Sequence, residues 1–452
     1  MKRASQMNDF TTGNIAKQIV LFSIPMLIGN LFQQMYSIVD AMVVGRFLGG
    51  GALAAVGVSM TAFHFFIAAL FGLTTGASVI ISQFFGAKQY DKLGTALSTS
   101  VLFLAAFSVI MTALGIIFTP ALLRLLNAPA DVFDYAVVYM RIQMGGLVFV
   151  IFFNMYTAYL RAMGNSRTPL YILIFATTFN GLLNILLVVV LGLGIGAVSA
   201  GTVVSQALAA VACYVYTRRR VPLLRVNKYS FDKKLFATIL KYGLPAALQL
   251  SFVNLAALTI ARLINSFGTA AIAGITAASR IDQMAILPIS TLSLALSTFV
   301  AQNMGANLEE RARQGFRTML LYMVLLAVGI SAVLVVTSPW LVSLFIDSTD
   351  MYAPEMLRTG QEYLRIMVIF YFLFAFLFGF NGFYRGAGDA VIAMVFPICS
   401  LSIRTISAYA LVHLAGMGPE ALAWSIPIGW GVTSAVSCIY YRKRLWAGKI
   451  VT

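Results

Sequence analysis

Charged residues are scarce in this chain of 452 residues. Asp, Glu, Lys and Arg together supply 10% of the sequence, whereas hydrophobic residues supply 60%. Soluble domains carry about 25% charged residues, so this composition excludes an ordinary soluble protein. It predicts an integral membrane protein.

Cysteine and histidine are also rare. The three cysteines, Cys213, Cys399 and Cys438, are odd in number and lie in apolar runs, which favours packing residues over disulfide or metal partners. His64 and His413 are the two histidines, and we interpret each as a hydrogen-bonded packing residue. The sequence has no Walker loop, no metal-ligand cluster and no nucleophile with its base. We therefore expect neither an enzyme nor a cofactor, and uphill transport would need an ion gradient.

Long apolar runs separated by short polar joints dominate what is present. A helix needs about 20 such residues to cross the hydrocarbon, and strands of a membrane barrel would alternate apolar and polar residues instead. The runs predict an all-α membrane protein with about twelve transmembrane helices. No cleavable signal peptide is expected, because the first apolar run is too long for a signal core. The predicted spans begin near Ile15, Leu53, Leu93, Val132, Pro169, Ile195, Leu235, Ala271, Met319, Glu355, Val391 and Ala421.

The net charge is +16, and the basic residues are distributed in step with the order of the spans. Basic residues such as Lys88 and Lys92 flank alternate spans, and the opposite joints carry acids such as Asp131 and Asp134. This positive-inside pattern predicts that both termini face the cytoplasm. The excess of cations is then a topology signal that contacts anionic membrane lipids, and no nucleic-acid partner is expected.

The second half of the sequence repeats the first. The loop "QFFGAK" at 83–88 returns as "QNMGAN" at 302–307, and "YMRI" from Tyr139 returns as "YLRI" from Tyr363. Arg161 and Gly164 match Arg385 and Gly388 in the same order. With an even number of spans in each half, the two halves enter the membrane from the same side, as in parallel-repeat secondary transporters.

The repeat sets the predicted domain organisation. We expect an N-terminal lobe of six helices at 1–217, a basic cytoplasmic linker at 218–234 and a C-terminal lobe of six helices at 235–452. A duplication that merely builds a large bundle is the alternative. It does not explain the polar residues inside the spans.

One carboxylate, Asp40, lies within the first span. An acid at a helix centre costs about 2.5 to 3.5 kcal/mol on insertion scales, so a compensating role is expected. Gln33, Tyr36 and Ser37 fall on the same helical face by three-and-four spacing. The alternative, a pair with Arg46, is awkward because six residues exceed one and a half turns.

Other spans of the first half offer polar partners for Asp40. Their amides and hydroxyls can hydrogen-bond either protonation state of a carboxyl, and burial disfavours its charged form, which predicts that Asp40 exchanges a proton. The second half has Ile260 or Thr259 at the matching position, so the chemistry is predicted to be one-sided. The polar residues on the fifth and sixth spans are Thr177, Asn180, Asn184, Ser199, Thr202 and Gln206.

Features of the second half leave alternatives open. The Phe-rich tenth span, "RIMVIFYFLFAFLFGFNGFYR", can be a wall for flat lipophilic ligands or lipid-facing bulk. Arg280 and Asp282 are interpreted as an ion-paired helix start near the outer surface, with an intramembrane polar site as the alternative. Arg404 is a lone cation of the eleventh span, and one interpretation places it in the cavity.

In this combination the motifs resemble the multidrug and toxic compound extrusion (MATE) family. The first-span stretch "PMLIGNLFQQMYSIVDAMVVGRFLG", the "QFFGAK" loop and the "LRAMGNSRTP" joint carry the resemblance, which covers nearly the whole chain. Within the family the sequence is most similar to the bacterial DNA-damage-inducible-F type.

The resemblance implies export of cationic and lipophilic drugs or dyes in exchange for protons or sodium, by alternating access. It further implies that Asp40 takes the proton, that Asn180, Asn184 and Thr202 surround it, and that Tyr36 lies beside it on the same helix. Some relatives have an acid where this chain has Asn184, so a single-carboxylate site is expected.

Proton coupling is favoured over sodium coupling. Sodium-coupled relatives carry acids inside the seventh and tenth spans, whereas Glu355 and Glu362 lie toward the outer end of the tenth span here. The alternatives are a sodium-coupled antiporter and a flippase for a lipid-linked precursor, which would need several cavity cations. A channel or membrane enzyme fits the repeat less well. The expected location is the bacterial inner membrane, and the expected state is a monomer.

Overall fold

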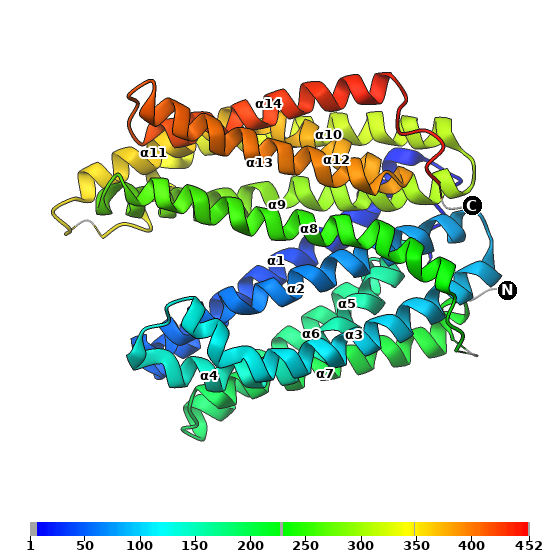
Figure 1. The fold of residues 1–452 in the computed structure, drawn as a ribbon, viewed down its shortest axis with the longest axis horizontal. Helices are drawn as coiled ribbons and strands as arrows, with labels where there is room; N and C mark the ends of the chain where they lie inside the picture. The colour runs from blue at the N-terminus through cyan, green and yellow to red at the C-terminus, as the bar shows by residue number, and fades with distance from the viewer. Residues whose placement is uncertain (1–6, 227–228, 348, 451–452) are drawn as a thin grey trace. The chain divides into compact units, whose positions relative to one another are not determined.

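The protein is almost entirely helical. A computed structural model describes residues 7–226, 229–347 and 349–450, and these residues contain α-helices, one short π-helix and one 3-10 turn but no strand. Within them, ten helices are long and apolar enough to cross a membrane, and two bent helix pairs bring the number to twelve. The prediction of an all-α protein with about twelve spans is confirmed (Figure 1).

The first half of the chain forms α1 to α7. The π-helix η1 continues α6 without a break in the chain, so the two together make one span. The bounds are α1 Ile15–Phe47, α2 Gly49–Gly86, α3 Tyr90–Leu125, α4 Ala130–Gly145, α5 Leu147–Ala162, α6 Arg167–Asn184, η1 Ile185–Val190 and α7 Ile195–Arg220.

The second half repeats this order from α8 to α14. The ninth span, α10, begins ten residues before the predicted Met319, because its first turn contains charged residues such as Glu309. The bounds are α8 Lys233–Asn265, α9 Thr269–Gly305, α10 Glu309–Ser343, α11 Ala353–Ile369, α12 Tyr371–Ala387, α13 Ala390–His413 and α14 Glu420–Arg442.

The fourth and tenth spans are bent at equivalent places in the repeat. The α4–α5 pair bends by 47° at Gly146, and the α11–α12 pair bends by 53° at Phe370. A Cβ added at Gly146 would overlap the side chain of Val203 on α7, so the close approach of the two helices requires glycine there. Hydropathy does not reveal these bends, because both runs remain apolar through the break.

Two compact units divide the chain. The first unit comprises Val20–Ala247 with the segment that ends at Thr12, and the second unit comprises Leu248–Thr452 with Gly13–Ile19. The change from one unit to the other therefore occurs within α1 and within α8. The segment between α7 and α8 lies within the first unit, where backbone amides of Ser230 and Asp232 donate to hydroxyls on α3.

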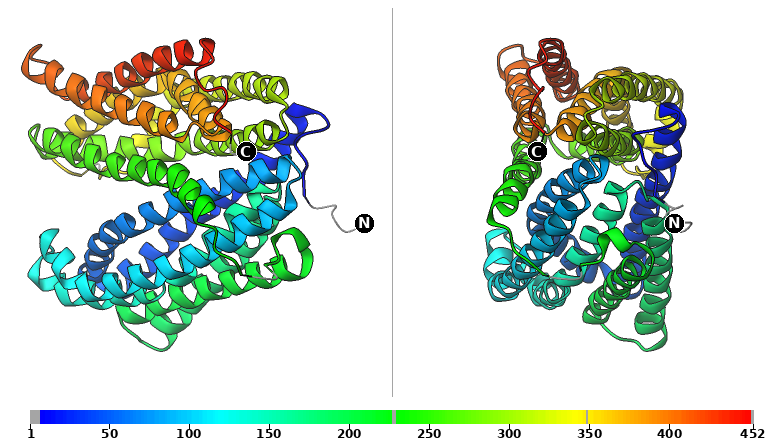
Figure 2. Two further views of the ribbon diagram at one scale, coloured as in Figure 1. Left: turned by 45° about the vertical axis from the view of Figure 1, so that its right-hand side comes forward. Right: turned by 90° about the vertical axis from the view of Figure 1, so that its right-hand side faces the viewer.

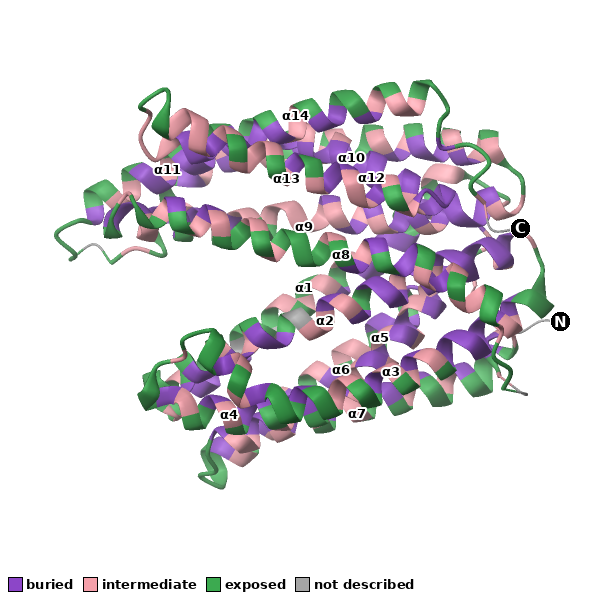
Figure 3. Cartoon of the chain, in the orientation of Figure 1, coloured by how far each residue is buried: buried purple, intermediate pink, exposed green. Residues whose placement is uncertain are grey.

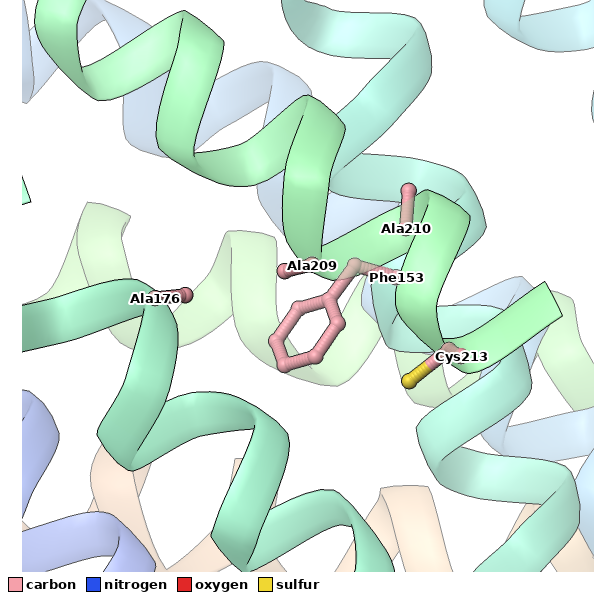
Figure 4. Packing of buried hydrophobic residues seen from close by; sticks show 5 residues of the cluster. All are labelled: Phe153, Ala176, Ala209, Ala210 and Cys213. Atoms are coloured by element: carbon pink, nitrogen blue, oxygen red, sulfur yellow. The ribbon is translucent and has the colours of Figure 1, made fainter. Parts of the chain in front are cut away.

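In the first unit, α2 packs against α3, α4 and α5, and α7 packs against α4, α5 and α6. A core cluster joins three of these helices around Phe153 of α5, with Ala176 of α6 and Cys213 of α7 against its ring (Figure 4). Burial alternates along each helix, so that one stripe faces the unit's interior (Figure 3). Cys213 is fully buried in this cluster, as a packing residue.

In the second unit, α9 packs against α10, α11 and α12, and α13 packs against α14 (Figures 1 and 2). Phe374, Phe380 and Phe383 of α12 are buried within the unit, where they contact other aromatic rings. Both interpretations of the Phe-rich span as an exposed surface are wrong for these three rings. They form the interior packing of the second unit.

Candidate functional site

Asp40 is buried on α1 with an amide as its hydrogen-bond partner. Its side chain is 6% exposed, and Asn184 Nδ2, at the end of α6, donates to Asp40 Oδ1 over 2.6 Å. Gly29 of α1 lies beside Leu170 and Leu173 of α6, so the two helices are in contact there. The two helices thereby bring the acid to an amide 144 residues further along the chain.

The amide of Asn184 belongs to a short polar chain. Its Nδ2 also donates to Asn180 Oδ1 over 3.0 Å, one turn earlier on α6, and Asn180 Nδ2 donates to Thr202 Oγ1 of α7 over 3.5 Å. Both hydrogens of the Asn184 amide are therefore used. Its Oδ1 is buried and has no hydrogen-bond partner among the described residues, and a Cβ at Gly201 would overlap it.

A tyrosine that the sequence analysis used only as a repeat marker also belongs to this site. Tyr139 of α4 is 1% exposed and lies close enough to Asp40 to feel its charge. Its hydroxyl accepts from Gln143 Nε2 over 3.2 Å, and its carbonyl accepts from Ser199 Oγ over 2.9 Å. A polar aromatic side chain inside a span, present in both repeats, was the signal that could have identified it.

A cavity of about 280 Å³ opens beside Asp40 between α1 and α6. Its lining is mostly apolar, with Phe32, Met35 and Val43 from α1. The polar lining includes Asp40 together with Asn180 and Asn184. A mostly apolar cavity with one carboxylate suits a lipophilic ligand that carries a positive charge.

The predicted polar face of α1 is only partly at this cavity. At 100° per residue, Phe32 and Val43 lie on one side of Asp40, whereas Gln33 and Ser37 lie on the other. Gln33 and Ser37 are exposed, and the Ser37 hydroxyl donates to the Gln33 carbonyl over 3.2 Å. The structure does not bring Gln33 into contact with Asp40, and the Tyr36 side chain lies outside the described residues.

The alternative partner of Asp40 is not found. Arg46 is exposed, and the ion pairs among the described residues do not include Asp40. The described part of the chain also contains no group of three His, Cys, Asp or Glu side chains that could hold a metal ion. Asp40 is thus a buried carboxylate, and the side chain that donates to it among the described residues is the neutral amide of Asn184.

In the second unit, the interpretation of Arg280 and Asp282 as an ion-paired helix start is wrong. Arg280 is exposed, and the ion pairs among residues 7–226, 229–347 and 349–450 do not join it to Asp282. Asp282 instead accepts a hydrogen bond from Tyr371, the first residue of α12, over 2.8 Å. Residues two apart on a helix do not face each other, so Arg280 and Asp282 have different surroundings.

Comparison with known proteins gives a family match in each half of the chain. The MatE family model matches residues 25–186 and 245–410. The chain is 29% identical over 440 residues to a probable multidrug resistance protein, YpnP, of Bacillus subtilis, and 97% of each chain is covered. It is 25% identical over 451 residues to the multidrug export protein MepA of Staphylococcus haemolyticus, with 98% of each chain covered.

Solved structures show the same fold. An outward-facing multidrug resistance MATE family transporter matches with a TM-score of 0.89 and 22% identity, covering 99% of this chain and 98% of that chain. A crystal structure of MATE in the bent conformation matches with a TM-score of 0.91 at the same identity and the same coverage. At this identity the likeness establishes the fold of the chain.

Proposed function

Because the chain belongs to the MatE family of membrane transporters, we propose that it exports lipophilic or cationic compounds in exchange for protons, with Asp40 as the proton carrier. Membership makes the chain a multi-pass transporter and not an enzyme. The relatives named for multidrug resistance and export support the substrate class. The assignment to the DNA-damage-inducible-F type remains a prediction.

The observation that carries the proposal is the contact of Asp40 with a neutral amide beside an apolar cavity. A buried carboxylate that lacks a cation is costly when ionised, and it favours either a proton or a bound positive charge. The two therefore compete for the same group. Protonation from outside would release a cationic ligand, and ligand binding from inside would release the proton.

Asn184 suits this exchange because it can serve both forms of the acid. Its amide hydrogens donate to an ionised carboxylate, as they do to Asp40 Oδ1. Its Oδ1, which lacks a described partner, can accept from a protonated carboxyl after a rotation of the amide. Asn180 and Thr202 then stabilise whichever orientation Asn184 takes.

The test is efflux of a lipophilic cationic dye from inverted vesicles under an imposed pH gradient, with a sodium gradient as the second arm. Asp40→Asn keeps the size of the side chain and its hydrogen bonding but removes the charge, and we expect it to lose proton-driven efflux. Asp131→Asn, which removes an exposed acid in the same unit, is the matched control. Efflux driven by sodium alone, or wild-type efflux by Asp40→Asn, would contradict the proposal.

We also propose, from the pattern of charges, the bacterial inner membrane with both termini in the cytoplasm, and a monomer that works by alternating access. The basic positions at alternate joints support the orientation. Cysteine labelling from each side of the membrane at Lys88 and at Asp131 checks it, since the two positions should react from opposite sides.

A further inference from the structure

The second unit contains a polar cluster that the proposed function does not use. Asp282 of α9 accepts from the Tyr371 hydroxyl, and Arg404 of α13 acts on Asp282 electrostatically. Tyr363 of α11 lies against both charged groups and also interacts with Ser279 of α9. Four helices thus contribute side chains to one place inside the second unit.

Two residues of this cluster match residues of the Asp40 site in the repeat. Tyr139, beside Asp40, matches Tyr363, beside Asp282, and the same offset along the sequence pairs Asn180 with Arg404. Duplication has therefore kept the tyrosine and exchanged an amide for a guanidinium. The acid comes from a different helix, α9, so a comparison of α1 with α8 alone, which gave Ile260 or Thr259, suggested that the second half lacks one.

Asp282 and Arg404 interact without forming an ion pair. The ion pairs of the described residues, taken to 4.0 Å, do not include them, and Arg404 Nε is buried without a hydrogen-bond partner among those residues. Both side chains are half-buried rather than sealed in the core. At least one donor of the Arg404 guanidinium, Nε, is therefore available to a ligand within the described residues.

The surroundings of Arg404 add an aromatic surface. The ring of Trp430 of α14 is half-buried and lies 6.4 Å from Tyr371 and 5.1 Å from Phe374, measured between ring centroids. Helix α14 can come this close to Arg404 because Gly429 has no side chain, and a Cβ there would press on the backbone of α13. Trp430 thus adds a partly exposed aromatic face next to Tyr371, the residue that donates to Asp282, and an aromatic face suits a flat ligand.

We propose that Arg404, Asp282 and Tyr371 form a second ligand site, which binds the anionic group of an aromatic carboxylate or sulfonate together with a proton. The guanidinium holds the anion. Asp282 competes with the anion while it is ionised, and it stops competing when it takes a proton. The site lies wholly within the second unit, and it goes beyond the role proposed for Asp40.

The groups that face Asp282 make this coupling specific. They are the hydroxyls of Tyr371 and Tyr363 and the charge of Arg404. On α10, which also packs against α9, no charged residue occurs between Arg317 and the helix end at Ser343. Helix α11, which packs against α9 as well, carries charged residues that are all exposed. They are Glu355, Arg358, Glu362 and Arg365. Arg404 is the charged group that acts on Asp282.

The experiment is equilibrium dialysis of the purified full-length protein with labelled naphthalene sulfonate, which stays ionised at every pH used. Wild-type protein should bind the sulfonate about tenfold more tightly at acidic than at alkaline pH, because the proton on Asp282 removes a competing negative charge. Asp282→Asn should bind tightly at both pH values. Arg404→Gln should lose binding at both, and Arg404→Lys should keep part of it.

Two readouts keep the result interpretable. Size-exclusion chromatography and thermal unfolding confirm that each variant is folded, and Arg404→Lys remains informative if Arg404→Gln is not. Asp131→Asn is the matched control and should follow wild type. Binding of the sulfonate that is unchanged by Arg404→Gln, or that is independent of pH in the wild type, would overturn the proposal.

Discussion

The two units surround an acidic side chain in different ways. In the first unit, Asp40 meets the amide of Asn184 and an apolar cavity. In the second unit, Asp282 meets a tyrosine hydroxyl and the field of a guanidinium. The repeat has kept the helices and the bend of the fourth and tenth spans, so the difference lies in a few side chains. A shared scaffold can thus carry one site suited to a positive charge and another suited to a negative one.

The largest effect is expected when the first unit receives the residue that the second unit has at the matching position. Asn180→Arg gives the first unit the cation of the second unit, and the new charge would pair with Asp40 in place of a proton or a cationic ligand. We expect proton-driven export of a cationic dye to fall by about tenfold or more, since a paired buried acid no longer exchanges its proton readily. Vesicle efflux measures the effect.

Asn180→Met is the matched control for this exchange, because it has comparable length but no charge. If both variants lose efflux equally, bulk in the cavity rather than charge explains the loss. The contrast between the units would then not depend on Arg404.

Two glycines allow a second, smaller comparison. A Cβ at Gly201 would overlap Asn184 Oδ1 in the first unit, and a Cβ at Gly429 would overlap the Ser400 carbonyl oxygen in the second. Gly201→Ala should displace the amide that holds Asp40 and reduce efflux. Gly429→Ala should lower the free energy of unfolding by about 1 to 3 kcal/mol through backbone displacement. Efflux and thermal unfolding of both variants distinguish the two effects, and equal losses of efflux would contradict the separate roles.

How much of this could be predicted from the sequence differs between the scaffold and the sites. Hydropathy predicted the spans, because the bilayer imposes a length on each helix. Asp40, Asn180, Asn184 and Thr202 were all named from their residue types, and the structure links them in one hydrogen-bonded chain. The role assigned to that chain remains a prediction.

The partners that the sequence did not predict are long-range. Tyr371 reaches Asp282 from 89 residues away, and no local pattern places them together. The nearest charged neighbour along the chain, Arg280, was chosen instead, although it points elsewhere and is exposed. The orientation of α1 about its axis was similarly uncertain from spacing alone, which is why Gln33 was assigned to the cavity face that Phe32 occupies.

The joints before α6 and α13, which match in the repeat, allow the smallest test. In the second unit, Lys449 Nζ donates to the buried carboxylate of Asp389 over 2.7 Å, whereas Asn165 holds the matching position in the first unit with a bond to Thr168. Burial alone would lower the pKa of Lys449, but the hydrogen bond to Asp389 leaves that pKa raised. A raised folded-state pKa gives stability that is present below the unfolded value and is lost as pH rises through the folded one.

Lys449→Met should therefore lower the melting temperature by about 2 to 4 °C at neutral pH. The difference from wild type should shrink in strongly alkaline solution, where Lys449 loses its proton in the wild type as well. Lys443→Met, which changes an exposed lysine of the same segment, is the control. A difference that is independent of pH would show that packing of the aliphatic part of Lys449, and not its charge, stabilises this contact.

The competition between proton and ligand at Asp40 can be measured without transport. A cationic dye is added to purified protein in weakly buffered solution near neutral pH, and a pH indicator records protons as the dye binds. The wild type and Asp131→Asn should release protons in proportion to bound dye, whereas Asp40→Asn should release none for the dye it still binds. Dye binding without proton release in the wild type, or equal release from Asp40→Asn, would contradict the assignment of Asp40 as the coupling residue.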